Sequence, residues 1–339
     1  MSNPKPTFFI NASALKEAGC TAKFLFTVTE GLKLRAASSS KMEYGTAGHY
    51  FLADFYRGKD PKEAWATAKA HYEPFADDIR GNDFRSLSHL GQTCAAYAKQ
   101  YKDDDAISVL TDDKGDPFIE KQFAYPWHTS DEFDIVLTGT VDLLASYHGA
   151  DVIMDHKTTS AYPSGFFEKY EFEIQAMFYS WIMRRLYNMP AYLPFVINGL
   201  FLKKPTLSYF NKGGPFDGVV LQRSGLIEFP ESKMEEFERW LREKLSSLIL
   251  AIRMQLEDPG YAYSPEAQER SYCNAHFGRC SFQSICDAFP EYRGAVVSGD
   301  YIKEPYKPLE WHLFCVGRTH RYPAMSGVIT LDPRPALSI

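Results

Sequence analysis

The sequence predicts an α/β protein in which a mainly helical N-terminal part precedes a central sheet with helices on its faces. Three observations predict this fold class. Residues 41–104 contain three segments with apolar residues at helical spacing, and residues 117–158 contain three β-type segments separated by short polar breaks. An apolar helix is then expected between these strands and two later ones. Strands, a covering helix and further strands are typical of a sheet packed between helices.

The N-terminal helices have recognisable boundaries. A first helix is expected to begin near Asn11 to Ser13, because these side chains can cap the free amides of its first turn. A second should end at Gly58, since glycine commonly terminates helices. The three longer helices are expected in "KMEYGTAGHYFLADFYRG" (41–58), "PKEAWATAKAHYEPFADDI" (61–79) and "FRSLSHLGQTCAAYAKQYKDD" (84–104).

The sheet is expected to begin after about residue 115. Its strands are predicted in "PFIEKQFAYPW" (117–127), "FDIVLTGTVDLLASYH" (133–148), "ADVIMDHKT" (150–158), "YLPFVINGLFLKK" (192–204) and "FDGVVLQRS" (216–224). The segment 168–188 is apolar over most of its circumference, so this helix should be buried against the sheet. A long amphipathic helix is predicted over residues 232–258.

Composition and charge exclude several classes of protein. The chain has 37 lysines and arginines against 43 acids, a net charge of −6, whereas a protein that coats nucleic acid nonspecifically is usually basic. An enzyme that holds cations in a carboxylate site can be acidic overall. No apolar run approaches the roughly 20 residues of a membrane helix, and the first residues lack the build of a signal peptide. We therefore expect a cytoplasmic protein with no membrane partner.

Two acids and a lysine suggest a metal-assisted site. Side chains alternate along a strand, so Asp155 and Lys157 share one face while His156 points away. The short break "YHGA" allows a hairpin that brings Asp142 close to Asp155. Neighbouring carboxylates repel each other unless a cation such as Mg²⁺ lies between them. By itself, Asp-x-Lys at a strand end is more often a solvated edge or a surface ion pair.

Further polar residues support the interpretation only in combination. Gln175 and Tyr179 lie one turn apart on the apolar helix, where each alone would be a satisfied polar group of the core. His49 lies on an early helix, where a lone histidine is usually a packed residue. Glu120, in the strand before the hairpin, is as compatible with a surface ion pair as with a site role.

In order and spacing, this set resembles the PD-(D/E)XK nuclease superfamily, specifically its RecB-like branch. The resemblance rests on Gly45 with His49, on Glu120, on "GTVD" ending at Asp142, on Asp155-x-Lys157 and on Gln175-x3-Tyr179. It implies a restriction-endonuclease-like mixed central sheet flanked by helices, with a helical N-terminal elaboration and a C-terminal cysteine-cluster region. Two departures are Val141 in place of proline before Asp142, and aspartate rather than glutamate at position 155.

The resemblance also assigns roles and boundaries. His49, Asp142, Asp155 and the backbone carbonyl of His156 would bind Mg²⁺ or Mn²⁺, Lys157 would be the catalytic lysine, and Gln175 and Tyr179 would contact DNA or support the site. Residues 1–290 would form a single nuclease domain, with a helical part (1–110), a catalytic α/β core (115–225) and a long helix with the cysteine cluster (231–290). Residues 291–339 would be a C-terminal tail.

Three of the six cysteines lie close together at 273, 280 and 286. Their spacing is wider than that of ordinary zinc fingers, whereas thiolates for an iron–sulfur cluster come from irregular spacings and one distant residue. Cys20 is the natural fourth ligand. The arrangement resembles the RecB-like nucleases with a [4Fe–4S] cluster, including CRISPR-associated and helicase-associated exonucleases, although the gap between Cys273 and Cys280 is wider. Structural zinc is the alternative.

These expectations combine into a metal-dependent deoxyribonuclease that hydrolyses phosphodiester bonds, an exonuclease preferring single strands or duplex ends, in recombination or repair. DNA would be the partner. The chain has no Walker-type motif of its own, so if a motor is involved it would be a separate helicase or recombination partner. Candidates for phosphate contacts are Lys33, Arg35, Lys41, Lys203 and Lys204, although each of them alone is more often a solvated surface residue. The alternatives are a non-catalytic DNA-binding or assembly protein on the same scaffold and a metal-dependent hydrolase of small phosphate esters.

Overall fold

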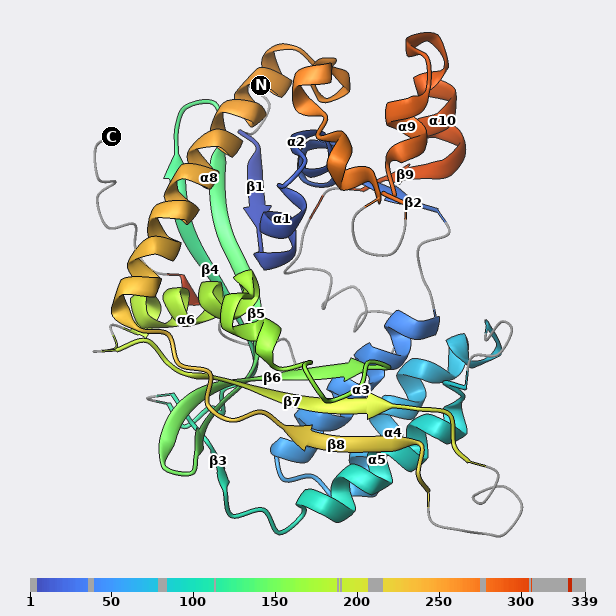
Figure 1. Ribbon diagram of the computed structural model, residues 1–339, viewed down its shortest axis with the longest axis vertical. Coiled ribbons are helices and arrows are strands. Elements are labelled where there is room, and N and C mark those ends of the chain that lie inside the picture. The colour runs from blue at the N-terminus through green and yellow to red at the C-terminus, as the bar shows by residue number, and fades with distance from the viewer. Residues whose placement is uncertain are drawn as a thin grey trace.

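A computed structural model shows a mixed sheet with helices on both faces (Figure 1). The structure describes residues 5–35, 40–78, 84–112, 114–187, 189, 191–206, 216–274, 279–304, 306 and 329–330. The fold class predicted from the sequence is confirmed. Within these ranges no helix has the length and apolar character needed to cross a membrane.

The helices follow the predicted segments closely. Asn11 caps α1 by accepting a hydrogen bond from the amide of Ala14, as expected from its position. Gly58, with φ +79°, follows the end of α3. The bounds are α1 Ala12–Glu17, α2 Thr21–Phe24, α3 Ser40–Tyr56, α4 Pro61–Tyr72, α5 Leu87–Tyr101, α6 Ile174–Tyr187, α8 Glu231–Glu257, α9 Gln283–Asp287 and α10 Arg293–Asp300.

The main sheet runs in the order β10-β4-β5-β6-β7-β8, and β1 and β3 also pair with β5. A second, two-stranded sheet joins β2 to β9. The β6–β7 and β1–β5 pairs are parallel, whereas β5 is antiparallel to both β4 and β6. The bounds are β1 Thr7–Ile10, β2 Leu32–Leu34, β3 Ile107–Val109, β4 Ile119–Thr129, β5 Asp134–Tyr147, β6 Ala150–Thr159, β7 Phe195–Leu202, β8 Val219–Arg223, β9 Tyr301–Lys303 and β10 Ile329–Thr330.

Two hydrophobic clusters cover opposite faces of β6. Ile153 belongs to the cluster that contains the buried residues of α1, α6 and α8. Its neighbours Val152 and Met154 belong to a cluster with Ala53 of α3. Because strand side chains alternate between faces, Asp155 and Lys157 continue the α6 face and His156 continues the α3 face. The sheet therefore places the polar end of β6 between helices of both layers.

Two segments depart from the sequence expectations. The short strand β1 pairs with residues 134–137 of β5, a long-range contact that no local pattern indicated. The segment expected to be a tail, residues 291–339, contains α10 and β9, and β9 pairs with β2 near the N-terminus. Most of residues 305–339 lie outside the described residues, and the predicted division into domain and tail stays a prediction.

Candidate metal and catalytic centre

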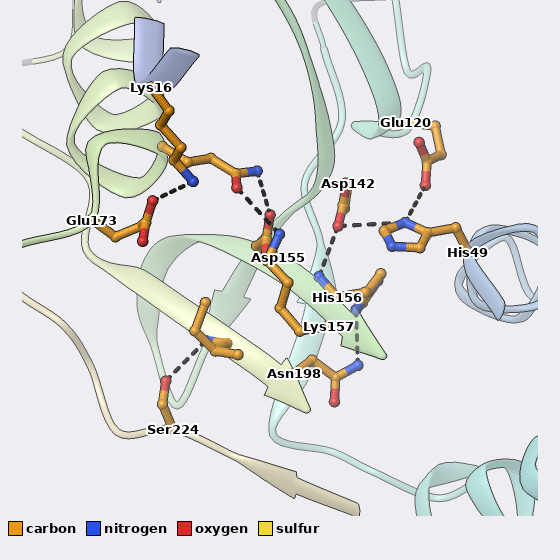
Figure 2. A network of polar contacts seen from close by, with 12 residues as sticks. Lys16, His49, Glu120, Asp142, Asp155, His156, Lys157, Glu173, Asn198 and Ser224 are labelled. Atoms are coloured by element: carbon orange, nitrogen blue, oxygen red, sulfur yellow. Dashed lines mark hydrogen bonds and ion pairs between the residues drawn. The ribbon is translucent and has the colours of Figure 1, made fainter. Parts of the chain in front are cut away.

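The site lies where β5 and β6 separate. Leu143 of β5 pairs with Met154 of β6, so Asp142 comes just before the paired region and Asp155 just after it. The predicted hairpin is confirmed, and the two carboxylates are close enough for Asp155 to raise the pKa of Asp142. The amide of His156, at the start of the diverging part of β6, donates to Asp142 Oδ2 at 2.7 Å (Figure 2). The place where β5 and β6 diverge is called the fork. A backbone hydrogen bond at the fork thus fixes the carboxylate of Asp142.

Two further side chains reach Asp142. His49 projects from α3 with its Nδ1 3.6 Å from Asp142 Oδ2 and 3.4 Å from Glu120 Oε1 (Figure 2). Ligand atoms of His49, Glu120 and Asp142 all lie within 4.8 Å of one another, the one such group of three or more among the described residues. One imidazole and two carboxylates form a donor set that suits a divalent cation such as Mn²⁺ or Mg²⁺.

Glu120 reaches this cluster through an unusual backbone conformation. Its φ is +50°, in the left-handed region that non-glycine residues seldom occupy. Its neighbours Ile119 and Lys121 pair with Leu143 and Val141, so Glu120 lies opposite Asp142 across the β4–β5 ladder. Such conformations cost about 1–3 kcal/mol and concentrate at functional sites. Here the strained residue is a carboxylate that joins the candidate metal group.

The electrostatics of the cluster favour a bound cation. Burial raises the pKa of Asp142, and the charges of Asp155 and Glu120 raise it further. Burial alone would lower the pKa of His49, but Asp142 and Glu120 outweigh that effect and raise it. Burial is thus the main cause at Asp142 and neighbouring carboxylates are the main cause of the rise at His49, so negative charge is crowded into a partly buried space. A divalent cation would neutralise that charge, so the residues present fit the group.

Asp155 and Lys157 form the second half of the site. Lys157 Nζ lies 2.6 Å from Asp155 Oδ2, and Gln175 bridges both residues, donating to Asp155 Oδ1 at 2.9 Å and accepting from Lys157 at 3.3 Å. Burial would lower the pKa of Lys157, but Asp155 and Asp142 raise it above its usual value, so the side chain carries its positive charge. Gln175, at the first turn of α6, therefore aligns acid and lysine.

Tyr179, one turn beyond Gln175, packs behind the carboxylates. Its ring is 5.9 Å from that of Phe123, and burial raises the pKa of its hydroxyl. Both rings lie over Gly139, where a methyl group would stand 2.6 Å from Phe123 and 3.0 Å from Tyr179. The glycine of the "GTVD" segment is thus required for α6 to approach β5 this closely.

His156 faces the other side of the sheet, as predicted. Its ring is buried, stacks on Tyr56 at 5.5 Å, and its Nδ1 lies 2.9 Å from the amide of Asn198. Asn198 also donates to the hydroxyl of Tyr97 at 2.7 Å. This buried polar network holds β6 against α3 and α5. The ligand role proposed for the His156 carbonyl oxygen stays a prediction.

Four of the five described cysteines lie close together in the structure. Cys20, Cys273, Cys280 and Cys286 line one small pocket, and the described cysteines form no disulfide. The amide of Glu269 lies 3.4 Å from Cys20 Sγ and donates to it. Burial raises the pKa of Cys286 to about 11, and Cys20 and Cys280 contribute by their charge. These thiols do not readily ionise together, because each negative charge opposes the next. A metal cation would compensate the charge and bind them as thiolates.

The structure brings most of the predicted site residues together. His49 joins Asp142, and Asp155, Lys157, Gln175 and Tyr179 lie around them. Glu120, for which the sequence left a surface role open, belongs to the compact group, whereas Asp155 is bonded to Lys157 and Gln175. The sequence signal for Glu120 was its place in the strand before the one that carries Asp142.

Two of the residues expected to contact phosphate have other partners. Lys33 forms an ion pair with Glu304 at 2.9 Å, and Arg35 donates to the carbonyl oxygens of Ser298 and Gly299. These side chains join β2 to the C-terminal segment. Lys203 and Lys204 are exposed beyond the end of β7.

The mixed sheet, its flanking helices and the carboxylate–lysine site are the arrangement that the sequence resemblance implies. The sequence matches the family described as the PD-(D/E)XK nuclease superfamily over residues 11–287, and the chain belongs to this superfamily. The match extends from the cap of α1 to the last residue of α9, so it includes both the fork and the four cysteines. No curated protein matches the chain.

Proposed function

We propose that this protein is a metal-dependent deoxyribonuclease of the RecB-like branch, an exonuclease that prefers single strands or ends in recombination or repair. The observation that carries the proposal is the compact group of His49, Glu120 and Asp142 beside the Asp155–Lys157 pair. Family membership supports the nuclease chemistry. The order of the site residues and the four cysteines support the branch.

Each side chain has a role in this proposal. His49, Glu120 and Asp142 would hold Mg²⁺ or Mn²⁺, with Asp155 and the His156 carbonyl completing the set. A cation bound there would act as a Lewis acid on the phosphate. The ammonium of Lys157 would stabilise the negative charge that grows on the phosphate oxygens as water attacks phosphorus. Gln175 would keep Asp155 and Lys157 aligned through its hydrogen bonds, and Tyr179 would hold α6 in place by packing against Phe123.

We further propose that Cys20, Cys273, Cys280 and Cys286 hold a structural [4Fe–4S] cluster. In a tetrahedral zinc site each Zn–S bond is about 2.3 Å long, which places the four sulfurs about 3.8 Å from one another. Among the described residues, no three of these cysteines bring their sulfurs within 4.8 Å of one another, which favours a larger group than a single ion. The Glu269 amide would then stabilise the Cys20 thiolate.

Cleavage assays on end-labelled DNA test the proposed function. We expect the wild-type protein to shorten linear single strands or duplexes from their ends with Mg²⁺, to work at least as well with Mn²⁺, and to lose activity in EDTA. Circular DNA distinguishes an exonuclease from an endonuclease, and DNA labelled at either end gives the polarity. Binding without cleavage under all metal conditions would contradict the proposal, as would hydrolysis confined to small phosphate esters.

A further inference from the structure

A groove beside the site is lined by lysines and aromatic rings. It has a volume of about 700 Å³ and lies between α1, the start of α6 and one side of α8. Its lining includes Lys16, Phe172, Lys233, Trp240, Lys244 and Tyr272. The net charge of the whole chain is −6, so three lysines around one groove form a local exception. Glu236, which is exposed, also lines the groove.

Two of these lysines are available to an anion. Lys233 and Lys244 form no ion pair within the described part of the chain, and burial lowers the pKa of Lys244. Lys233 Nζ lies 4.2 Å above the centre of the Phe172 ring. Partly buried ammonium groups without a carboxylate partner are costly, and a phosphate would compensate that cost. Lys233 and Lys244 are eleven residues apart on α8, about 16 Å along the helix axis.

The aromatic side chains offer stacking surfaces. Phe172 is 72% exposed and Tyr272 is 46% exposed, values unusual for large apolar rings. Trp240 is partly exposed on α8, with its ring centre 5.6 Å from that of Phe237. Tyr272 lies directly on Gly19, where any side chain would collide with its ring. Exposed rings between lysines are the arrangement by which proteins bind single strands, whose bases are free to stack.

The groove connects with the catalytic fork. Lys16 pairs with Glu173, two residues before Gln175, and Figure 2 shows this pair next to Asp155 and Lys157. Phe172 and Ile174 line the groove, whereas Gln175 bonds to the site. Lys169 is close enough to both Lys16 and Lys157 for their charges to act on it. Lys16 and Lys169 therefore lie between the groove and the catalytic lysine, with Glu173 paired to Lys16.

We propose that this groove binds a segment of single-stranded DNA, with phosphates on Lys233 and Lys244 and bases on Phe172 and Trp240, and directs the strand to the fork. The inference rests on the proposed nuclease function for its ligand class. A duplex, whose bases are already stacked on each other, would gain the phosphate contacts only. The groove would thus be the origin of a preference for single strands.

Binding measured without cleavage tests the groove separately from catalysis. Fluorescence anisotropy with a labelled thymidine oligonucleotide in EDTA compares Lys233→Ala/Lys244→Ala with Lys99→Ala/Lys114→Ala, a pair of exposed lysines outside the groove that changes the net charge equally. The groove pair should lower the slope of log Kd against log salt concentration by about 1.4, because each phosphate contact to a single strand contributes about 0.7. The control pair should leave it unchanged.

A second comparison tests stacking. Phe172→Ala should weaken binding of the oligonucleotide roughly 5- to 150-fold, the equivalent of about 1–3 kcal/mol for one stacked base. Phe289→Ala, which removes a ring that is 70% exposed and does not line the groove, should have no effect. Circular dichroism verifies that each variant is folded.

Two results of the binding experiments would overturn the inference. One is equal binding by the groove and control pairs; the other is unchanged binding by Phe172→Ala together with equal displacement of DNA by polyglutamate, which would make the groove a general anion site. If the groove variants still cleave DNA with unchanged strand preference, the proposal that the groove binds single strands is wrong, and the nuclease proposal is unaffected. If the variants bind DNA as expected but no metal supports cleavage by the wild type, the nuclease proposal is wrong, and the proposal that the groove binds single strands is unaffected.

Discussion

Replacing Lys157 with alanine is expected to lower the rate of DNA cleavage roughly 10²- to 10³-fold, the usual loss when one group that stabilises transition-state charge is removed. Lys157 lies 2.6 Å from Asp155 and is held by Gln175, so its ammonium has one fixed position in the fork. Its charge would be needed most when the phosphate is under attack. DNA binding should therefore change far less than the turnover number.

Single-turnover cleavage and binding in EDTA, measured on the same preparation, separate these effects. Lys121→Ala is the matched control, because Lys121 is also a partly buried strand lysine with an acidic partner, Asp112 at 3.3 Å, but lies outside the fork. Because Lys157→Ala leaves Asp155 without its cation, Lys157→Gln provides a second variant that keeps a hydrogen-bond donor. Near-normal cleavage by both Lys157 variants would exclude the catalytic role.

If the proposed cluster is present, replacing Cys286 with serine is expected to remove it and to destabilise the protein by about 4 kcal/mol or more. A cluster held by the four cysteines that line this pocket would join residue 20 to residues 273–286. Closing a loop of 100 residues already contributes about 4.7 kcal/mol in the chain-entropy description, and longer loops contribute slightly more. The melting temperature should fall by roughly 8 °C or more, at about 2–4 °C per kcal/mol for domains of 150–250 residues.

The measurement combines calorimetry with metal analysis of protein purified without oxygen. The wild type should be brown and contain about four irons per chain if four thiolates hold a cubane cluster. Cys94→Ser serves as the control, because Cys94 is buried in α5 away from the other sulfurs and should affect stability without changing the metal content. Stoichiometric zinc in colourless wild-type protein would rule out the cluster and leave the nuclease proposal intact.

The local features of this fold were predictable from the sequence because they depend on nearby residues. The β5–β6 hairpin follows from the four-residue break "YHGA" (147–150), and with it the proximity of Asp142 and Asp155. Alternation along β6 also predicted the opposite directions of Lys157 and His156. Helix ends at Asn11 and Gly58 follow from capping preferences that act within a few residues.

The remaining features depend on contacts between distant segments. Glu120 enters the metal group only because its backbone adopts φ +50°, which a strand pattern does not reveal. Strand β1 pairs with β5 more than a hundred residues later. The lysines and rings of the groove come from α1, α8 and the segments before α6 and beside Cys273, so their convergence is a property of tertiary packing.

The central claim is that His49, Glu120 and Asp142 hold one divalent cation at the fork between β5 and β6. Crystals grown with Mn²⁺, measured at a wavelength where manganese scatters anomalously, locate such an ion directly. We expect one anomalous peak within coordination distance of all three side chains, and its loss in Asp142→Asn. A wild-type crystal grown with Mn²⁺ that shows no anomalous peak at the fork, or shows manganese bound only elsewhere, would contradict the assignment.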